Sequence, residues 1–410
     1  MNAAFPELPP YKALAAALRK TTEHLARELV RPSDTPPGWN ELEFGVAQSV
    51  AAMQGITVLL GNRLRWRGPP AWEAFLAGQR EQSVLREALL ARLLERIDAA
   101  TREARIPCVA LKGSALRSLG LYAPGERPSS DVDLLVRKSD SAAVAKIVGG
   151  LDYVMIEDVE RHTSYVPRKR TTPITLGEHA SNVISIEVHT LVAEALPIRK
   201  VDITERLQPA HPVPGVNPYP SLAALLLHLL LHAADNMKTH CLRQVQLHDV
   251  ALLLGRFGAS DWDALLEAAR AGDLWWAYPP LAMTVRYYDC RVPQALLYSL
   301  RRSCPAVLRR VSDRNELTAV SWSNLRISAL PGIAWSHTPI EALRYAWRRV
   351  SPERDTLEEV RTALELQPQL GIVPWYQVSQ SKRIVRWLVS RPPRVQTISA
   401  VAAALRGSET

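Results

Sequence analysis

The sequence predicts an α+β fold, in which a small mixed sheet with helices lies between helical N-terminal and C-terminal regions. Three observations predict it. Residues 1 to about 105 show helical spacing of apolar side chains and little sign of strands. Residues 106 to 217 change to short apolar or alternating runs that are typical of strands. The helical spacing returns after a proline-rich linker from Pro209 to Pro220. The chain has 410 residues, 47% of them hydrophobic, so it can bury a sizeable core in two or three domains.

The N-terminal region is predicted to contain several helices. Apolar spacing indicates helices over Tyr11 to Leu29, Glu43 to Leu60 and Gln82 to Ala104. The first two are separated by a loop from Pro32 to Gly38, as its composition of proline, serine, aspartate and glycine indicates. The last helix leads the chain into the first predicted strand.

A strand, a tight turn and a helix follow one another at the start of the α/β region. Ile106 to Leu111 is a short apolar run, Lys112-Gly113-Ser114 forms the turn, and Ala115 to Leu119 is helical in pattern. Glycine lets the backbone approach a ligand closely, the N–H groups at a helix start attract phosphate, and Ser114 can cap the helix. Turns of this kind are common, and only the surroundings favour phosphate binding.

Two aspartates, Asp131 and Asp133, open the apolar run that ends at Val136. Side chains two apart on a strand project from the same face, so both carboxylates can hold the same cations. Their repulsion costs energy that a divalent metal turns into attraction, and neutralising both is expected to raise stability without metal. On a solvent-exposed edge strand the same pair is a surface feature. Two-metal phosphoryl chemistry also needs a further carboxylate.

Glu187 is the natural third carboxylate. It lies in a predicted strand within Asn182 to Thr190, where alternation separates an apolar face from a polar one. In isolation the polar face is better interpreted as solvated, and the upstream aspartate pair favours the functional interpretation. The apolar face carries Ile184, Ile186 and Val188, and the polar face carries Ser185, Glu187 and His189.

These motifs together resemble those of the bacterial family of uncharacterised nucleotidyltransferases in the DNA polymerase β superfamily. The resemblance rests on Leu111 to Ser114, Tyr122, Arg127, Asp131 to Val136 and Glu187 to His189. The stretch from Leu222 to Ala234, Arg243 with His248-Asp249, and the stretch from Trp347 to Glu353 are similar to the family's helical parts. The resemblance implies a polymerase-β-like catalytic core at 106–217, after a helical N-terminal region at 1–105. A helical domain at 218–340 would close the nucleotide cleft, and a basic helical region would occupy 341–410.

The motifs and the resemblance predict metal-dependent nucleotidyl transfer. Asp131, Asp133 and Glu187 are the expected catalytic residues and metal ligands, for Mg²⁺ or Mn²⁺. An NTP donor would be held by Lys112, Gly113, Ser114 and Arg127. In-line attack by an acceptor on the α-phosphorus would expel pyrophosphate, with Glu187 or bulk base taking the proton. The acceptor stays open between a small molecule, a peptide, a protein and tRNA.

Two rival functions remain. One is a toxin-like transferase that adds nucleotides to tRNA, and the other is a catalytically inactive nucleotide-sensing scaffold. A complete acidic triad argues against the scaffold. The basic C-terminal region would support the transferase that acts on tRNA. The net charge of the chain is +9, and no acidic residue lies between Glu365 and Glu409. That region can bind nucleic acid, or it is a solvated arginine-rich surface, and its aromatics either stack bases or anchor the segment. The residues concerned are Lys382, Arg383, Arg386, Arg391, Arg394 and Arg406, with Trp375, Tyr376 and Trp387.

A group of helical histidines is harder to interpret. His228, His232 and Asp235 have i, i+4, i+7 spacing and can form a metal face. The leucines around them favour buried, hydrogen-bonded histidines instead. In a third interpretation His232, Lys238 or Arg243 lines the nucleotide cleft. The roles of His189, His228, His232 and Arg243 stay open.

The remaining features predict a cytoplasmic protein without membrane association. The four cysteines are scattered, with neither a zinc-type pair nor a disulfide framework, which favours a reducing compartment. The first residues lack a basic segment followed by an apolar one. The most apolar stretch, Leu222 to Ala234, is too short to span a bilayer and is interrupted by two histidines.

Overall fold

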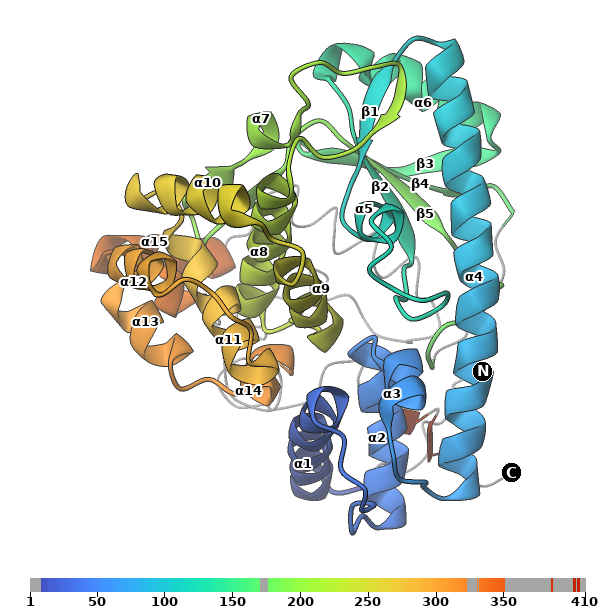
Figure 1. Cartoon of the computed structure of the whole chain (residues 1–410), viewed down its shortest axis with the longest axis vertical. Helices are drawn as coiled ribbons and strands as arrows, with labels where there is room; N and C mark the ends of the chain where they lie inside the picture. Colours follow the sequence, from blue (N-terminus) through green and yellow to red (C-terminus); the bar gives the residue numbers. More distant parts are fainter. Residues whose placement is uncertain are drawn as a thin grey trace.

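A mixed six-stranded sheet lies in the middle of the sequence, and helices from both sides of it in the chain pack around it (Figure 1). The computed structural model describes residues 9–169, 176–322, 330 and 332–350, together with 385, 401, 402, 404 and 405. The predicted α+β class is confirmed. The six strands are β1 (Pro107–Ala110), β2 (Asp131–Leu135), β3 (Tyr153–Asp158), β4 (His162–Pro167), β5 (Ser185–His189) and β8 (Gly215–Asn217). A separate antiparallel pair consists of β6 (Ala193–Ala195) and β7 (Lys200–Asp202).

The strand order is β3-β4-β5-β2-β1-β8. β2 is parallel to β5 and β1 is parallel to β8, whereas the other neighbours are antiparallel. The segment from Pro209 to Pro220 was interpreted as a proline-rich linker at the end of the α/β region. It contains β8, because Gly215 takes a positive φ of 97° and the chain then pairs along β1.

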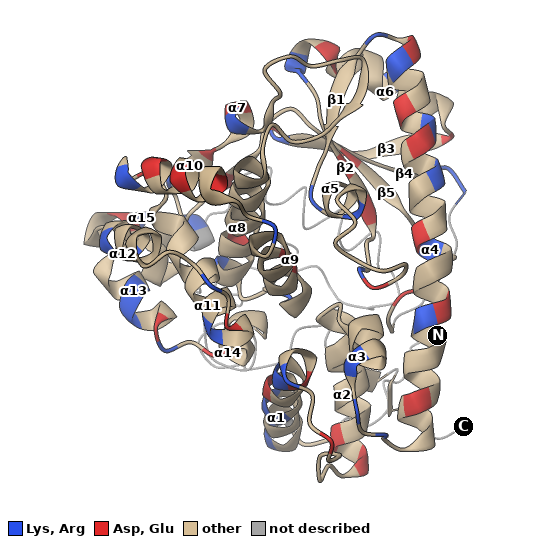
Figure 2. Ribbon diagram, viewed as in Figure 1, with Lys and Arg blue, Asp and Glu red and all other residues tan. Residues whose placement is uncertain are grey.

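One face of the sheet is covered by α4 (Pro70–Glu103) and α6 (Ser141–Gly150). The even-numbered side chains of β2 and β5, such as Val132 and Ile186, pack there with Leu93 and Ile97 of α4. Each such buried aliphatic side chain stabilises the fold by about 1.5–3 kcal/mol. Charged residues of both signs recur along the rest of α4 (Figure 2). Because side chains alternate along a strand, Asp131, Asp133 and Glu187 project from the other face of the sheet.

The helices before the sheet differ from expectation in two places. The helix predicted over Glu43 to Leu60 is broken at Gly55, whose φ is +68°, so the chain turns by 114° between two helices. The fourth helix begins at Pro70, well before Gln82, because proline is favoured in a first helical turn. These helices are α1 (Tyr11–Val30), α2 (Glu41–Met53), α3 (Thr57–Arg63) and α4.

The helices after the sheet surround α8 (Leu222–Thr239), which is buried on nearly all sides, as its leucines predict. Ser221 caps its start by accepting a hydrogen bond from the backbone N–H of Ala224. The others are α9 (Gln244–Leu254), α10 (Ala259–Arg270), α11 (Tyr278–Tyr288), α12 (Gln294–Ser303), α13 (Ala306–Ser312), α14 (Leu317–Ser321) and α15 (Pro339–Val350). Two short helices lie between strands, α5 (Gly113–Ser118) and α7 (Thr204–Leu207).

Two sequence predictions concern membrane association and the basic C-terminal region. Among the described helices, none is long and apolar enough on its own to cross a membrane, and only the bent pair α2 and α3 passes that test together. The basic and aromatic residues of the C-terminal region, interpreted as either a nucleic-acid-binding or a solvated surface, lie outside the described residues. Their role stays a prediction.

Candidate active site

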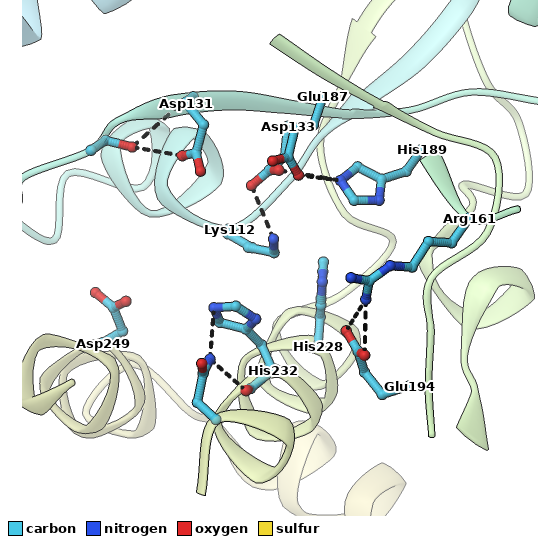
Figure 3. A network of polar contacts seen from close by, with 12 residues as sticks. Lys112, Asp131, Asp133, Arg161, Glu187, His189, Glu194, His228, His232 and Asp249 are labelled. Atoms are coloured by element: carbon cyan, nitrogen blue, oxygen red, sulfur yellow. Dashed lines mark hydrogen bonds and ion pairs between the residues drawn. The ribbon is translucent and has the colours of Figure 1, made fainter. Parts of the chain in front are cut away.

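Two acidic residues meet on neighbouring strands. In the parallel register of β2 and β5, Asp133 lies beside Glu187 and Asp131 lies beside Ser185. Asp133 and Glu187 lie close together, beside Lys112 and His189 (Figure 3). Their even-numbered neighbours pack toward α4 and α6, so the two carboxylates project from the opposite face of the sheet. The hydroxyl of Ser129 lies 3.4 Å from Asp131 Oδ1 at the start of β2. The sequence-predicted carboxylates thus gather at one place on the sheet.

His189 completes a group that is able to hold a metal ion. Its Nε2 lies 3.2 Å from Asp133 Oδ1 and 3.3 Å from Glu187 Oε2. One ligand atom from each of the three residues lies within 4.8 Å of the others. Carboxylate oxygens suit Mg²⁺ and Mn²⁺, and a neutral imidazole is a further ligand for a transition metal. The donors fit a divalent ion, and this group contains His189 where the sequence predicted Asp131.

Lys112 places a positive charge beside the carboxylates. Its Nζ lies 3.1 Å from Asp133 Oδ2, and the side chains of the two residues are 18% and 5% exposed. Burial would raise the pKa of Asp133, but the charges of Lys112 and His189 hold that pKa well below its usual value. The repulsion expected within the aspartate pair is therefore offset at Asp133 by cations of the protein itself.

Asp131 has the opposite electrostatic environment. Burial, followed by the charges of Asp133 and Glu187, raises the pKa of Asp131 to about 6. Burial would lower the pKa of His189, but its hydrogen bonds to Asp133 and Glu187 raise it. Among these groups, Asp131 is the carboxylate whose negative charge destabilises the metal-free site.

The turn before α5 is built differently from the prediction. Helix α5 begins at Gly113, and the buried Ser114 lies inside it, so Ser114 does not cap the helix as expected. Gly113 is needed because a Cβ there would lie 2.3 Å from Nη1 of Arg127. The close approach at this glycine is therefore made by a protein side chain.

Arg127 is turned toward helix α9. Its Nε and Nη2 each donate a hydrogen bond of 2.8 Å to the carboxylate of Asp249. The hydroxyl of Tyr122 donates a third bond, of 2.6 Å, to the same carboxylate. The structure thus brings Arg127 to Asp249, a residue the sequence analysis gave no role in the site. A buried acid in an apolar helix is the signal that could have pointed to it.

The wall opposite the sheet carries the helical histidines (Figure 3). His228 is buried and hydrogen-bonded to Tyr219, and His232 contacts Asn236. Burial lowers the pKa of His232 to about 3. His228 thus fits the interpretation as a buried, hydrogen-bonded residue, whereas His232 and Asp235 are only partly buried. Among the described residues, the group of side chains that could hold a metal ion does not include these three.

Two of the other suggested cleft residues contact the protein. Arg243 Nε donates to the carbonyl of Met53 at 3.0 Å, which ties α9 to the end of α2. Lys238 donates to the carbonyl of Ala195 at 2.7 Å. Nearby, Arg161 and Glu194 form an ion pair of 3.0 Å (Figure 3).

Arg86 positions the strands and was not predicted. It donates to the carbonyls of Ser129, Asn182 and Val183, at 2.9, 2.6 and 2.9 Å, from the buried stripe of α4. These carbonyls belong to the chain entering β2 and β5, so one side chain fixes both acidic strands. A charged residue in phase with Leu90, on the apolar stripe of a helix, is the sequence signal for such a role.

Comparison with known proteins gives the family. The model of a family described as "Uncharacterised nucleotidyltransferase" matches residues 40–286, which include the turn, both acidic strands, α8 and α9. None of the curated proteins matches the chain. A solved structure, the solution structure of the antibiotic-resistance factor ANT(2'')-Ia, is similar with a TM-score of 0.31 and 17% identity, over 45% of this chain and 92% of that one. Because the family model spans more than half of the sequence, the chain belongs to the family of uncharacterised nucleotidyltransferases.

Proposed function

We propose that the protein transfers a nucleoside monophosphate from an NTP to a hydroxyl or phosphate of an acceptor, with release of pyrophosphate and with a divalent metal. The single observation that supports this most is the pairing of Asp133 with Glu187, with His189 against both, in a chain of this family. Carboxylates gathered in this way serve metal-assisted phosphoryl transfer.

The metal would be held by Asp133 and Glu187, with Asp131 or His189 completing its ligands. A bound Mg²⁺ or Mn²⁺ would supply positive charge to the phosphate oxygens and lower the pKa of the acceptor. Lys112 would neutralise phosphate charge, as its ammonium already lies among the carboxylates. Gly113 and Ser114 would place the turn next to the nucleotide, and Arg127, paired with Asp249, would hold the loop before β2.

The reaction forms one bond and breaks one. The acceptor oxygen bonds to the α-phosphorus, and the bond from that phosphorus to the bridging oxygen of pyrophosphate breaks. We assign the proton of the acceptor to Glu187, whose side chain is 29% exposed, whereas that of Asp133 is 5% exposed. The greater exposure gives Glu187 a route for passing the proton to solvent.

A labelling experiment tests the proposed transfer and identifies the acceptor. Purified protein is incubated with each α-labelled NTP, Mg²⁺ or Mn²⁺ and a cell lysate, and label is followed into protein, RNA and small molecules. We expect pyrophosphate release, and its loss in Asp133→Asn but not in Glu205→Gln, a change at an exposed residue of α7. Label in RNA would favour the tRNA-modifying alternative. NTP binding without pyrophosphate from any donor would favour the nucleotide-sensing scaffold and contradict the proposal.

A further inference from the structure

The backbone of Lys112 is strained. Its φ is +46° and its ψ is −112°, a combination that residues with a Cβ rarely adopt. His240 and Asp289 also have positive φ, but their ψ values of 44° and 35° lie in the ordinary left-handed region. A conformation like that of Lys112 persists only where its surroundings hold it, and such residues cluster at functional sites.

Tyr219 and His228 supply that support. The backbone N–H of Lys112 donates to the hydroxyl of Tyr219 at 3.1 Å, and this hydroxyl shares a hydrogen bond of 2.7 Å with Nδ1 of His228. Tyr219 and His228 are buried, so water does not compete for these bonds. The carbonyl of Lys112 accepts from the N–H of Leu116. Both backbone polar groups of Lys112 are therefore fixed, one of them from helix α8.

The fixed backbone of Lys112 directs its side-chain ammonium toward Asp133. Lys112 Nζ contacts Asp133 Oδ2, while His189 Nε2 contacts Asp133 Oδ1. Both oxygens of the central carboxylate are thus already engaged by cationic or polar hydrogen-bond donors of the protein. A metal ion bound to Asp133 through Oδ2 would lie close to the ammonium of Lys112, and the repulsion between the two cations favours movement of the ammonium away from Asp133.

We propose that Tyr219 and His228 are positioning residues that hold the Lys112 ammonium on Asp133 as a built-in counter-cation, which a divalent metal must displace. This inference rests on the proposed metal-dependent function. The displaced ammonium becomes available to the phosphates of the nucleotide, so metal binding and nucleotide binding are coupled through Lys112. The device also gives His228 a role, which the sequence left open.

The test is a titration of the full-length protein with Mn²⁺ in the absence of nucleotide, with free Mn²⁺ followed by electron paramagnetic resonance. Lys112→Met removes the competing charge, so we expect about tenfold tighter Mn²⁺ binding. Tyr219→Phe releases the backbone of Lys112, so we expect a smaller change in the same direction. The double variant should bind Mn²⁺ like Lys112→Met alone, because Tyr219 acts through Lys112. We expect a non-hydrolysable NTP to tighten Mn²⁺ binding by the wild type, and this effect should largely disappear in Lys112→Met.

Matched controls change the same residue types elsewhere. Lys138→Met and Tyr298→Phe, both at exposed positions, should leave the Mn²⁺ affinity unchanged. If Lys112→Met folds poorly, Lys112→Gly removes the ammonium and also accepts the positive φ. A merely structural role of Lys112 or Tyr219 predicts weaker Mn²⁺ binding, which is the opposite sign.

The outcomes separate the two proposals. Mn²⁺ binding that is unchanged or weakened in Lys112→Met and Lys112→Gly overturns the counter-cation inference and leaves the proposed function in place. Failure of the wild type and of both Lys112 variants to bind Mn²⁺ overturns the metal site, and the inference with it. Binding by the Lys112 variants but not by the wild type supports the inference in its strongest form.

Discussion

Arg127 and Asp249 form a doubly hydrogen-bonded ion pair between residues 122 positions apart in the sequence. Their side chains are 12% and 1% exposed, and the pair joins the loop before β2 to helix α9. Burial would lower the pKa of Arg127, but the charge of Asp249 raises it, so the guanidinium stays charged. The position of the acidic strand thus depends on a contact with the helical part of the chain.

Asp249→Asn is expected to destabilise the protein by about 3–5 kcal/mol, because it leaves the buried guanidinium of Arg127 without its charged partner. Chemical denaturation measures the free energy of unfolding. The control is Asp289→Asn, since Asp289 pairs with Arg31 on the surface and is 83% exposed. That change should cost no more than about 1 kcal/mol. Equal effects of the two substitutions would contradict a buried, stabilising pair.

Gly113→Ala is expected to cost about 1–3 kcal/mol, because the new methyl group must displace the guanidinium of Arg127 from a position fixed by Asp249. Thermal unfolding measures this loss, and nucleotide affinity should fall with it as the turn moves. Gly149→Ala in α6 is the matched control, since no atom lies within 4 Å of its added Cβ. It should stabilise the protein by about 0.4–1 kcal/mol. An unchanged Tm in Gly113→Ala would show that Arg127 adapts freely.

Asp131 and Asp133 are expected to affect stability with opposite sign in metal-free protein. The pKa of Asp131 is raised from 3.8 to about 6, so its contribution to stability is present below pH 4 and is lost as pH rises through 6. Asp131→Asn should therefore be more stable than the wild type by about 1–2 kcal/mol at pH 7.5, with the difference vanishing near pH 4.

The pKa of Asp133 is lowered, so its contribution is present above its unfolded value and is lost as pH falls. Asp133→Asn should destabilise the protein at pH 7.5, because Lys112 and His189 lose the charge that pairs with them. The stability gain expected from neutralising both aspartates is thus a prediction for Asp131 alone. Unfolding curves recorded with a chelator between pH 4 and 8 check both variants. The same sign of change for both at pH 7.5 would contradict this division.

Local patterns in the sequence were enough to predict the neighbouring strands β5, β2 and β1 and the polar side of the site. Alternation along the strand that contains Glu187 predicted which side chains face the core, and Ile186 and Val188 do pack there. Two-residue spacing placed Asp131 and Asp133 on one face. The reason is that side-chain direction in a strand has a period of two residues, which is a local property. The leucines of α8 likewise predicted a buried helix.

Other features depend on which segments meet in the folded chain. The pairing of Asp133 with Glu187 follows from the register of β2 and β5, and the bond between Arg127 and Asp249 from the packing of α9. The break at Gly55 and the strand within the proline-rich linker likewise involve contacts with distant residues. Lys112 could be located in a turn from the sequence, but its aim at Asp133 depends on Tyr219 and on His228 of α8. Electrostatic and hydrogen-bond energies fall steeply with distance and angle, so they depend on positions in space that residue types alone do not give.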